Sequence, residues 1–352
     1  MRFLLKFHAK AFILCFLPLS IFAKSPELIF ALDVIRHGDR TSLRELPSMP
    51  HQWEEGHGQL TAKGMRQTYE LGEKLRKKYI EETKLLSEFY QAHSLYARST
   101  DLDRTLMSAQ SVLYGLYPLG TGPKLLKHEA TDALPAAYQP IPIHTMHQSD
   151  KDVLLVDTHL PLFSQNFEQH VKTAPEWVQK HNHLKPNYAR WSKATGVNIA
   201  ELRQLISLGN ILYVYQENGI TLPDALSKED IAQIVDAGHW AFCFMFKPKP
   251  VGKAMGSPLL EHILENLSKA STQNQLKYML LSGHDSSLLA LLSALEVPLD
   301  EPPPYASHVN FSVYQSKDAQ PYVVISYNDK ILKPPVCGGE QCRLEQLKAL
   351  SL

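Results

Sequence analysis

The stretch ELIFALDVIRHGDR, residues Glu27 to Arg40, decides how this chain is organised and where its chemistry lies. Residues Glu27 to Ile35 form an apolar run with the length of a buried strand. Arg36, His37 and Arg40 follow and therefore stand at the carboxyl end of that strand. Their positive charges repel one another unless an anion lies between them, and guanidinium groups pair well with phosphoryl oxygens. The stretch therefore predicts a phosphate site in which an imidazole nitrogen of His37 reaches phosphorus.

Two further residues of this stretch have expected supporting roles. Gly38 is expected to let the backbone turn tightly and approach a ligand closely, because glycine has no side chain to obstruct either. Asp39 is expected to lie behind the pocket, where it orients an arginine or shapes the wall. We therefore place Asp39 outside the group of residues that touch phosphate.

A second chemical motif, SGHDSS, spans Ser282 to Ser287 and follows the apolar run from Lys277 to Leu281. The motif lies between a predicted strand and a predicted helix, so His284 and Asp285 are expected in a loop at the carboxyl edge of the sheet. Open α/β sheets bind ligands at that edge. The alternative is that Asp285 only caps the helix and that His284 is a turn residue. A second such junction in one chain favours the functional interpretation.

Arg98 is the third candidate for the site. It ends the strand pattern SLYARS, Ser94 to Ser99, and would add a third guanidinium group at the same edge. Arg104 follows one helical turn after Asp101, with Asp103 beside it. We predict that these carboxylates hold Arg104 in a local ion pair, outside the site.

Strand and helix patterns alternate along most of the chain, which predicts an α/β fold with a mainly parallel sheet flanked by helices. The core is expected in residues 24–135 and 236–352. Its last two strand patterns, 309–315 and 322–328, predict an antiparallel hairpin. Residues 136–235 carry helix patterns and no convincing strand, so we expect a smaller, mainly helical inserted domain there.

Residues 1–23 have the pattern of a secretory signal peptide, with a basic start, an apolar run from Ala11 to Phe22 and a small residue at Ala23. The alternative of a membrane helix is disfavoured because the apolar run is shorter than the roughly 20 residues that a span needs. A lipid anchor at Cys15 is disfavoured by Leu14, where a small residue is expected. We predict cleavage after Ala23, export to the periplasm or the cell exterior, and no membrane span in the mature chain.

Three cysteines follow the predicted signal, namely Cys243, Cys337 and Cys342. Export makes disulfides possible. Cys337 and Cys342 flank a four-residue loop that a disulfide can close, although their spacing is equally compatible with two free thiols. A zinc site is not predicted, because so few sulfurs are present. Cys243 lies in the apolar run AFCFMF and is expected to be a buried thiol.

The composition narrows the range of partners. The chain has 352 residues, of which 44% are hydrophobic, and 36 basic residues balance 36 acidic ones. Neutral overall charge argues against nucleic acid or an anionic membrane surface as a partner, so any anion site must arise from local placement of arginines. We predict no cofactor and no metal, and we leave a homodimer open.

The motifs resemble those of the histidine acid phosphatases, a branch of the histidine phosphatase superfamily. Similarity to the prostatic and lysosomal type extends in the same order through VIRHGDRTS and through the stretches 53–79, 96–109, 140–145, 282–287 and 337–347. The resemblance implies an α/β phosphatase fold, small phosphate monoesters as substrates and a short disulfide between Cys337 and Cys342.

Residues and resemblance together predict the mechanism. Neutral His37 attacks phosphorus through a ring nitrogen, and water then hydrolyses the phosphohistidine. Asp285 protonates the leaving alkoxide and afterwards acts as a base for the water. The groups expected around phosphate are Arg36, Arg40, Arg98 and His284.

Departures from the family pattern limit how far a substrate can be named. Thr41 and Ser42 follow Arg40, whereas relatives commonly have proline two residues after the second arginine. Asp39 is typical of the acid phosphatases rather than the phytases, although a phytase-like enzyme is the alternative hydrolase. A phosphomutase-like transferase is disfavoured by the signal sequence. An inactive secreted binding protein would be expected to have lost His37 or Asp285, and both are present.

Overall fold

The computed structural model describes residues 25–126, 128, 130–147, 151–156, 161–270, 275–315 and 320–350. The predicted signal peptide, residues 1–23, lies outside them. The helices are α1 (Ala62–Arg76), α2 (Asp103–Leu116), α3 (Pro161–Asn166), α4 (Pro175–Leu184), α5 (Tyr188–Thr195), α6 (Gln204–Glu217), α7 (Lys228–Phe244), α8 (Lys249–Ala270), α9 (Asp285–Ala294) and α10 (Leu344–Lys348). The strands are β1 (Glu27–Arg36), β2 (Leu95–Ser99), β3 (Ile143–His144), β4 (Tyr278–Gly283), β5 (His308–Gln315), β6 (Tyr322–Tyr327) and β7 (Lys330–Ile331). Among the described residues, no helix is long and apolar enough to cross a membrane.

The strands form one seven-stranded sheet in the order β3-β2-β4-β1-β5-β6-β7. Strands β3, β2, β4 and β1 run parallel to one another. Strands β5, β6 and β7 each run antiparallel to the strand before them in this order. The predicted α/β class, the parallel part of the sheet and the terminal hairpin are therefore confirmed.

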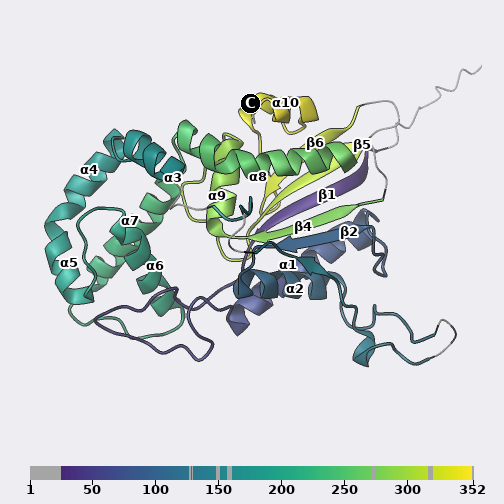
Figure 1. Ribbon diagram of the computed structural model, residues 1–352, viewed down its shortest axis with the longest axis horizontal. Coiled ribbons are helices and arrows are strands. Elements are labelled where there is room, and N and C mark those ends of the chain that lie inside the picture. The colour runs from purple at the N-terminus through teal and green to yellow at the C-terminus, as the bar shows by residue number, and fades with distance from the viewer. Residues whose placement is uncertain are drawn as a thin grey trace, which may run out of the picture.

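Strand β1 is buried on both faces, as its unbroken apolar pattern predicts for a central strand. Phe30, Leu32 and Val34 pack in the same cluster as residues of α8 and α9. Ala31 and Ile35 point the other way and pack in the cluster that contains residues of α1 and α2. Figure 1 shows these two layers, with α1 and α2 below the sheet and α8 above it.

The pairing of β1 with β4 aligns the two chemical motifs of the sequence. Arg36 lies opposite Gly283 in this parallel pair, and the His37 N–H donates to the Gly283 carbonyl at 3.1 Å. On the other side of β4, Ser99 of β2 lies opposite Ser282. All three strands therefore end at the same edge of the sheet, which faces helices α3 to α7 in Figure 1.

Gly38 has a different role from the predicted one. A Cβ atom on Gly38 would lie 2.2 Å from the carbonyl oxygen of Gly64, in the first turn of α1. Gly64 is equally constrained, because its own Cβ would lie 2.2 Å from the Asp39 carbonyl oxygen. The absence of a side chain at Gly38 therefore allows close packing of the loop on α1, whereas the sequence suggested close approach to a ligand.

Helices α3 to α7 form a separate helical layer with its own aromatic core. That core contains residues from all five helices, including Phe163, Trp177, Trp191, Leu212 and Ala241, and it continues into α8 and α9. The extent of this layer differs from the predicted insertion of residues 136–235. The two-residue strand β3 pairs with β2 inside that range, and α7 continues past residue 235 to Phe244. A two-residue strand is too short to show a pattern. The end of α7 is marked in the sequence by Pro248 and Pro250, and the predicted boundary at residue 235 falls inside the helix.

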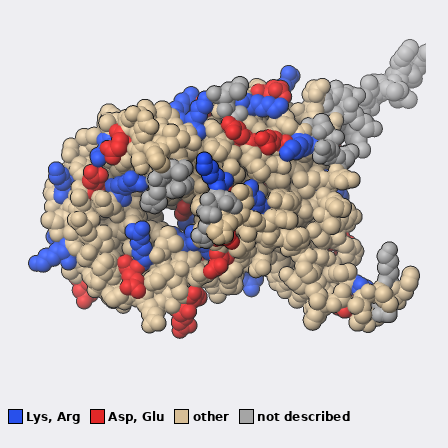
Figure 2. All heavy atoms as spheres, viewed as in Figure 1, with Lys and Arg blue, Asp and Glu red and all other residues tan. Residues whose placement is uncertain are grey.

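Charged side chains of both signs are interspersed over the face of the molecule drawn in Figure 2. No large area of a single sign is visible on that face. This distribution matches the balance of 36 basic and 36 acidic residues in the chain. A positive site must therefore be local, as the composition predicted.

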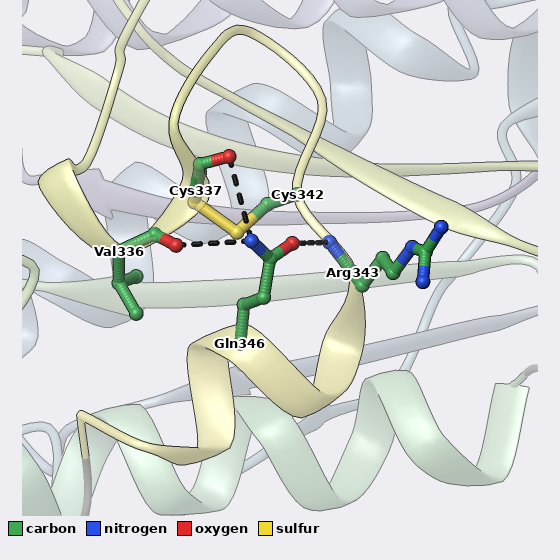
Figure 3. Close-up of a disulfide and its surroundings, with 5 residues drawn as sticks. All are labelled: Val336, Cys337, Cys342, Arg343 and Gln346. Carbon is green, nitrogen blue, oxygen red and sulfur yellow. Dashed lines mark hydrogen bonds between the residues drawn. A yellow bond between two sulfur atoms is a disulfide. The ribbon is translucent and has the colours of Figure 1, made fainter.

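A disulfide joins Cys337 to Cys342, as the family resemblance implied (Figure 3). The Gln346 side chain, at the start of α10, donates to the Val336 carbonyl at 3.0 Å and accepts from the Arg343 N–H at 2.8 Å. Cys342 also pairs with Val323 of β6 through two hydrogen bonds of 2.8 Å. The disulfide loop therefore attaches the carboxyl-terminal helix to the edge of the sheet. Cys243 is a buried free thiol, as predicted.

Loss of this disulfide should lower the stability of the protein. In the chain-entropy description, closing so short a loop restricts the unfolded chain by about 2 kcal/mol. We expect the double variant Cys337→Ala, Cys342→Ala to lose about that much free energy of unfolding in urea titrations. The unaltered protein under reducing conditions is the matched control and should show a similar loss. Equal stability of the oxidised protein and the double variant would contradict the prediction.

Candidate active site

His37 lies in the loop after β1, with only 2% of its surface exposed. Its Nδ1 atom lies 2.7 Å from the carbonyl oxygen of Gly38. A carbonyl oxygen only accepts hydrogen bonds, so Nδ1 carries the proton and donates it in this contact. The lone pair of the neutral ring is therefore on Nε2, which makes Nε2 the atom able to attack phosphorus.

The surroundings of His37 keep the ring neutral. Burial lowers its pKa well below 6.5, and the positive charges of Arg36 and Arg104, with His284 and Arg40, lower it further. The imidazole therefore stays unprotonated in mildly acidic solution, where an exposed histidine would be charged. A nucleophile built in this way retains its lone pair under acidic conditions.

Arg36 is the most heavily constrained arginine of the site. One terminal nitrogen forms an ion pair of 2.9 Å with Asp285 Oδ2, and the other donates to the Pro303 carbonyl. The guanidinium carbon also lies 4.1 Å from the ring centre of Tyr305. Its Nε is buried without a hydrogen-bond partner among the described residues. This nitrogen is a donor available to a ligand.

Arg40 connects the edge of the sheet at which β1 ends to the helical layer. One terminal nitrogen donates to the Thr41 carbonyl at 3.1 Å, and the other donates to Asn210 Oδ1 of α6 at 3.1 Å. Burial lowers the pKa of this guanidinium. A guanidinium nevertheless stays charged in acidic solution, so an anion that joins Arg40 recovers part of the cost of burying it.

Arg104, which the sequence placed outside the site, acts electrostatically on both histidines of the two motifs. Its charge is among the strongest influences that lower the pKa values of His37 and His284. Burial lowers the pKa of Arg104 itself to about 10, and its Nε has no hydrogen-bond partner among the described residues. Asp103 accepts a hydrogen bond from Gln59 at 2.9 Å. Arg104 is therefore the third arginine whose charge reaches the nucleophile.

Arg98, the predicted third arginine, is engaged elsewhere. Its guanidinium forms a buried ion pair with Asp152 and lies 2.9 Å from the sulfur of Met146. Neighbouring residues of a strand point to opposite faces, and Ala97 packs with the α1 and α2 layer. Arg98 therefore points to the other face, where Leu154, close to Asp152 in the chain, is packed. The strand end was correctly identified, but the direction of the side chain was not.

His284 lies beside His37 at the junction of β4 and α9. The two ring centres are 5.6 Å apart, and His284 Nε2 lies 3.0 Å from Thr100 Oγ1. Burial and the charge of Arg104 lower the pKa of His284 to about 3. The backbone N–H of His284 donates to Ser287 Oγ at 3.0 Å, which attaches this residue to the first turn of α9.

Asp285 is the first residue of α9, and its two oxygens have different partners. Oδ1 accepts the N–H of Ser286 at 2.8 Å, and Oδ2 is the atom paired with Arg36. Burial raises the pKa of this carboxyl, but the charges of Arg36 and Arg40, with His284 and the Ser286 N–H, lower it more strongly, to below 3.8. Without a ligand, Asp285 is therefore a carboxylate.

Asp39 supports the loop from behind. Its Oδ2 accepts a hydrogen bond of 2.7 Å from Thr61, the residue that caps α1, and its N–H donates to Gln67 at 2.8 Å. These contacts attach the loop of His37 to α1. Of the two roles considered for Asp39, the contacts favour shaping of the pocket over pairing with an arginine.

The arrangement brings three guanidinium groups, two neutral imidazoles and one carboxylate to one edge of the sheet. Buried positive charges that outnumber negative ones make a site for an anion, and the forked geometry of arginine matches phosphoryl oxygens. Among the described residues, no cluster of three or more histidine, cysteine or acidic side chains has the arrangement of a metal site.

Known proteins are similar to this chain in sequence and in fold. A lysosomal acid phosphatase from Xenopus laevis is 32% identical over 89% of this chain and 72% of its own length. The human prostatic acid phosphatase is 32% identical over 82% of this chain and 74% of its own.

Among solved structures, a phytase from Klebsiella sp. ASR1 superimposes with a TM-score of 0.69 at 16% identity, covering 93% of this chain and 94% of the phytase. A Hafnia alvei phytase in complex with tartrate gives a TM-score of 0.67 at 16% identity, covering 93% of this chain and 97% of that one. At such low identity these structures establish a shared fold.

A comparison with protein families agrees with these similarities in sequence and fold. Residues 27–328, from the first residue of β1 to the residue after β6, match the family described as the histidine phosphatase superfamily, branch 2. The matched range contains both motifs that end β1 and β4. This chain belongs to branch 2 of the histidine phosphatase superfamily.

Proposed function

We propose that this chain is an acid phosphatase that hydrolyses phosphate monoesters through a phosphohistidine on His37. The observation that carries the proposal is the contact of 2.7 Å between His37 Nδ1 and the Gly38 carbonyl, which leaves the lone pair on Nε2 among buried arginines. The relatives named acid phosphatases, at about 32% identity over most of the chain, support the same activity. The enzyme class is phosphoric monoester hydrolase.

Phosphate binding is assigned to groups whose charge or donors surround His37. These groups are Arg36, Arg40, Arg104 and His284. Donors that are already oriented stabilise the charge on the oxygens around phosphorus in the transition state, without rearrangement during the reaction. Arg104 takes the place that the sequence assigned to Arg98.

The reaction proceeds in two displacements. Nε2 of His37 forms a bond to phosphorus while the ester P–O bond breaks, and protonated Asp285 gives its proton to the leaving alkoxide. A water molecule then attacks the phosphohistidine, the P–N bond breaks, and Asp285 takes the proton of the water. Phosphate and alcohol are the products, and the starting state of both side chains is restored.

Asp285 has to gain a proton before the first step, although it is ionised in the free site. A dianionic phosphate binds the same guanidinium groups that lower the pKa of Asp285. Binding of phosphate therefore weakens the effect of the guanidinium charges on the Asp285 carboxylate and adds negative charge beside it. Both effects raise the pKa of Asp285 in the complex. Acidic solution supplies the proton. This requirement connects the geometry to activity at acidic pH.

The class of substrate follows from the same observations. The acid phosphatase relatives favour general monoesters, and a phytase-like alternative is not better supported, because the solved phytases share the fold at only about 16% identity. Neutral overall charge also gives no broad positive surface for a polyphosphate. A phosphomutase-like transferase and an inactive binding protein have no observation in their favour.

Export to the periplasm or the cell exterior is part of the proposal. The signal pattern in residues 1–23 motivates it, and the disulfide between Cys337 and Cys342 is of the kind that persists in oxidising compartments. Small phosphomonoesters are the proposed partners. A homodimer stays a prediction that size-exclusion chromatography with light scattering can test.

Replacement of His37 by alanine should abolish turnover, because the proposed covalent intermediate forms on this residue. Rapid quenching of the unaltered enzyme with ³²P-labelled substrate should trap an acid-labile label, and peptide mapping should place it on His37. The exposed residue His183 is a matched control, and His183→Ala should keep normal activity and labelling. Label on a serine, or substantial activity in folded His37→Ala, would remove the mechanism.

Arg104 and Arg98 make a paired test of the phosphate assignment. Arg104→Ala should lower kcat/KM by about 100- to 1,000-fold, the loss typical of a missing donor in a charged site, and should weaken competitive inhibition by phosphate and tartrate. Arg98→Ala should leave phosphate inhibition nearly unchanged but destabilise the fold by about 3–5 kcal/mol, because Asp152 loses its buried partner. Steady-state kinetics and urea unfolding measure both effects. The reverse pattern would return Arg98 to the site.

The proposed role of Asp285 as proton donor predicts how kcat depends on pH and in which direction it changes. Because the proton is lost as pH rises through the pKa of Asp285 in the complex, kcat should fall on the alkaline side, at a pH above the free-enzyme pKa measured by carboxyl NMR. Asp285→Asn should slow alkyl phosphates severely and an activated aryl phosphate much less, since a phenolate leaves without a proton. Equal losses on both esters would assign Asp285 another role.

A further inference from the structure

The loop between α9 and β5 is attached directly to the two central residues of the site. The Ala306 N–H donates to the His37 carbonyl at 3.2 Å, and the Arg36 N–H donates to the Ser307 carbonyl at 2.8 Å. The Pro303 carbonyl accepts from the Arg36 side chain. These three contacts place the intervening Tyr305 against the phosphate pocket. No sequence motif had marked this segment.

The ring of Tyr305 lies against two site residues. Its centre is 4.1 Å from the guanidinium carbon of Arg36 and 6.0 Å from the ring centre of His37. A cation over an aromatic face is attracted by the ring, and the flat contact also limits the directions in which the guanidinium can turn. The ring therefore helps to hold Arg36 in place beside the nucleophile.

The hydroxyl of Tyr305 is buried and has no hydrogen-bond partner among the described residues. The charges that act on it include Arg40, Arg36 and Asp285, and Arg104 in turn is influenced by Tyr305. Because the ring of Tyr305 lies against Arg36 and His37, its hydroxyl shares the surroundings of these two residues. A buried polar group without a partner is rare in folded proteins and calls for a water molecule or a ligand. Burial raises the pKa of Tyr305, so the phenol keeps its proton.

We propose that Tyr305 binds substrate, with its hydroxyl donating a hydrogen bond to a phosphoryl oxygen while its ring positions Arg36. The inference rests on the proposed function and adds a neutral donor to the charged ones. A phenol that donates to a dianion forms a charge-assisted hydrogen bond, which is stronger than one between neutral groups. The bond would serve both substrate and the product phosphate.

Tyr305→Phe separates the two parts of the residue, because the ring and its contact with Arg36 are kept and only the donor is lost. Inorganic phosphate is the probe, and calorimetric titration at acidic pH measures its affinity without requiring turnover. We expect roughly 10- to 100-fold weaker phosphate binding, the range typical of one hydrogen bond to a charged group. We expect kcat/KM to fall by a similar factor for alkyl and aryl phosphates alike.

Two further variants complete the test. Tyr322→Phe on β6 removes a hydroxyl from a tyrosine whose ring stacks on Tyr314, outside the site, and should leave phosphate affinity unchanged. Tyr305→Leu, which also loses the aromatic face beside Arg36, should bind phosphate more weakly than Tyr305→Phe. Circular dichroism and urea unfolding verify that each variant is folded.

The outcomes distinguish this inference from the proposed function. Unchanged phosphate affinity in folded Tyr305→Phe would overturn the inference, whatever the activity of the enzyme. A loss confined to alkyl esters with normal phosphate binding would also overturn it, because the hydroxyl would then contact the leaving group. Absence of turnover in the unaltered protein would refute the proposed function, and the phosphate titration would still decide whether Tyr305 binds the anion.

Discussion

The parallel pairing of β1 with β4 is the constraint on which the rest of the site depends. It sets Arg36 opposite Gly283 and lets the His37 N–H bond to the Gly283 carbonyl, so two motifs far apart in sequence meet at one edge. A shift of one residue would move Arg36 to the other face of the sheet and break its ion pair with Asp285. Burial of both strands on both faces makes such a shift costly, because each apolar side chain would meet the wrong layer.

Burial of positive charge at this edge explains how one site combines binding with chemistry. Arg36 pairs with Asp285, while burial lowers the pKa of Arg40 and Arg104, so an anion that joins these arginines recovers part of the cost of removing them from water. The same charges hold the pKa of His37 low and so preserve its lone pair. They also lower the pKa of Asp285, so this carboxyl is ionised in the free site. In the proposed mechanism, the nucleophile, the phosphate site and the proton donor are therefore linked through the same buried charges.

The sequence could predict those parts of the site that lie within one strand and its following turn. Arg36, His37, His284 and Asp285 lie at the carboxyl end of an apolar strand or within two residues of it, and the edge of the sheet brings such positions together. Arg98 and Arg104 were interchanged for a physical reason. Arg98 lies near the end of β2 and Arg104 lies in the helix that follows it, α2. The partner of Arg98 is Asp152, which comes from a loop 54 residues further along, and local spacing does not reveal it. Tyr305 was missed because its role depends on contacts of its loop with β1.

By itself, the sequence determined the α/β class, the neutral surface and the residue types at the ends of β1 and β4, because strand periodicity and local charge are properties of short segments. Only the tertiary structure decided the strand order and the pairing of Arg98 with Asp152. It also decided the tautomer of His37 and the role of Gly38 against α1. These outcomes follow from distances between residues remote in sequence, and such distances are set by packing of the whole chain.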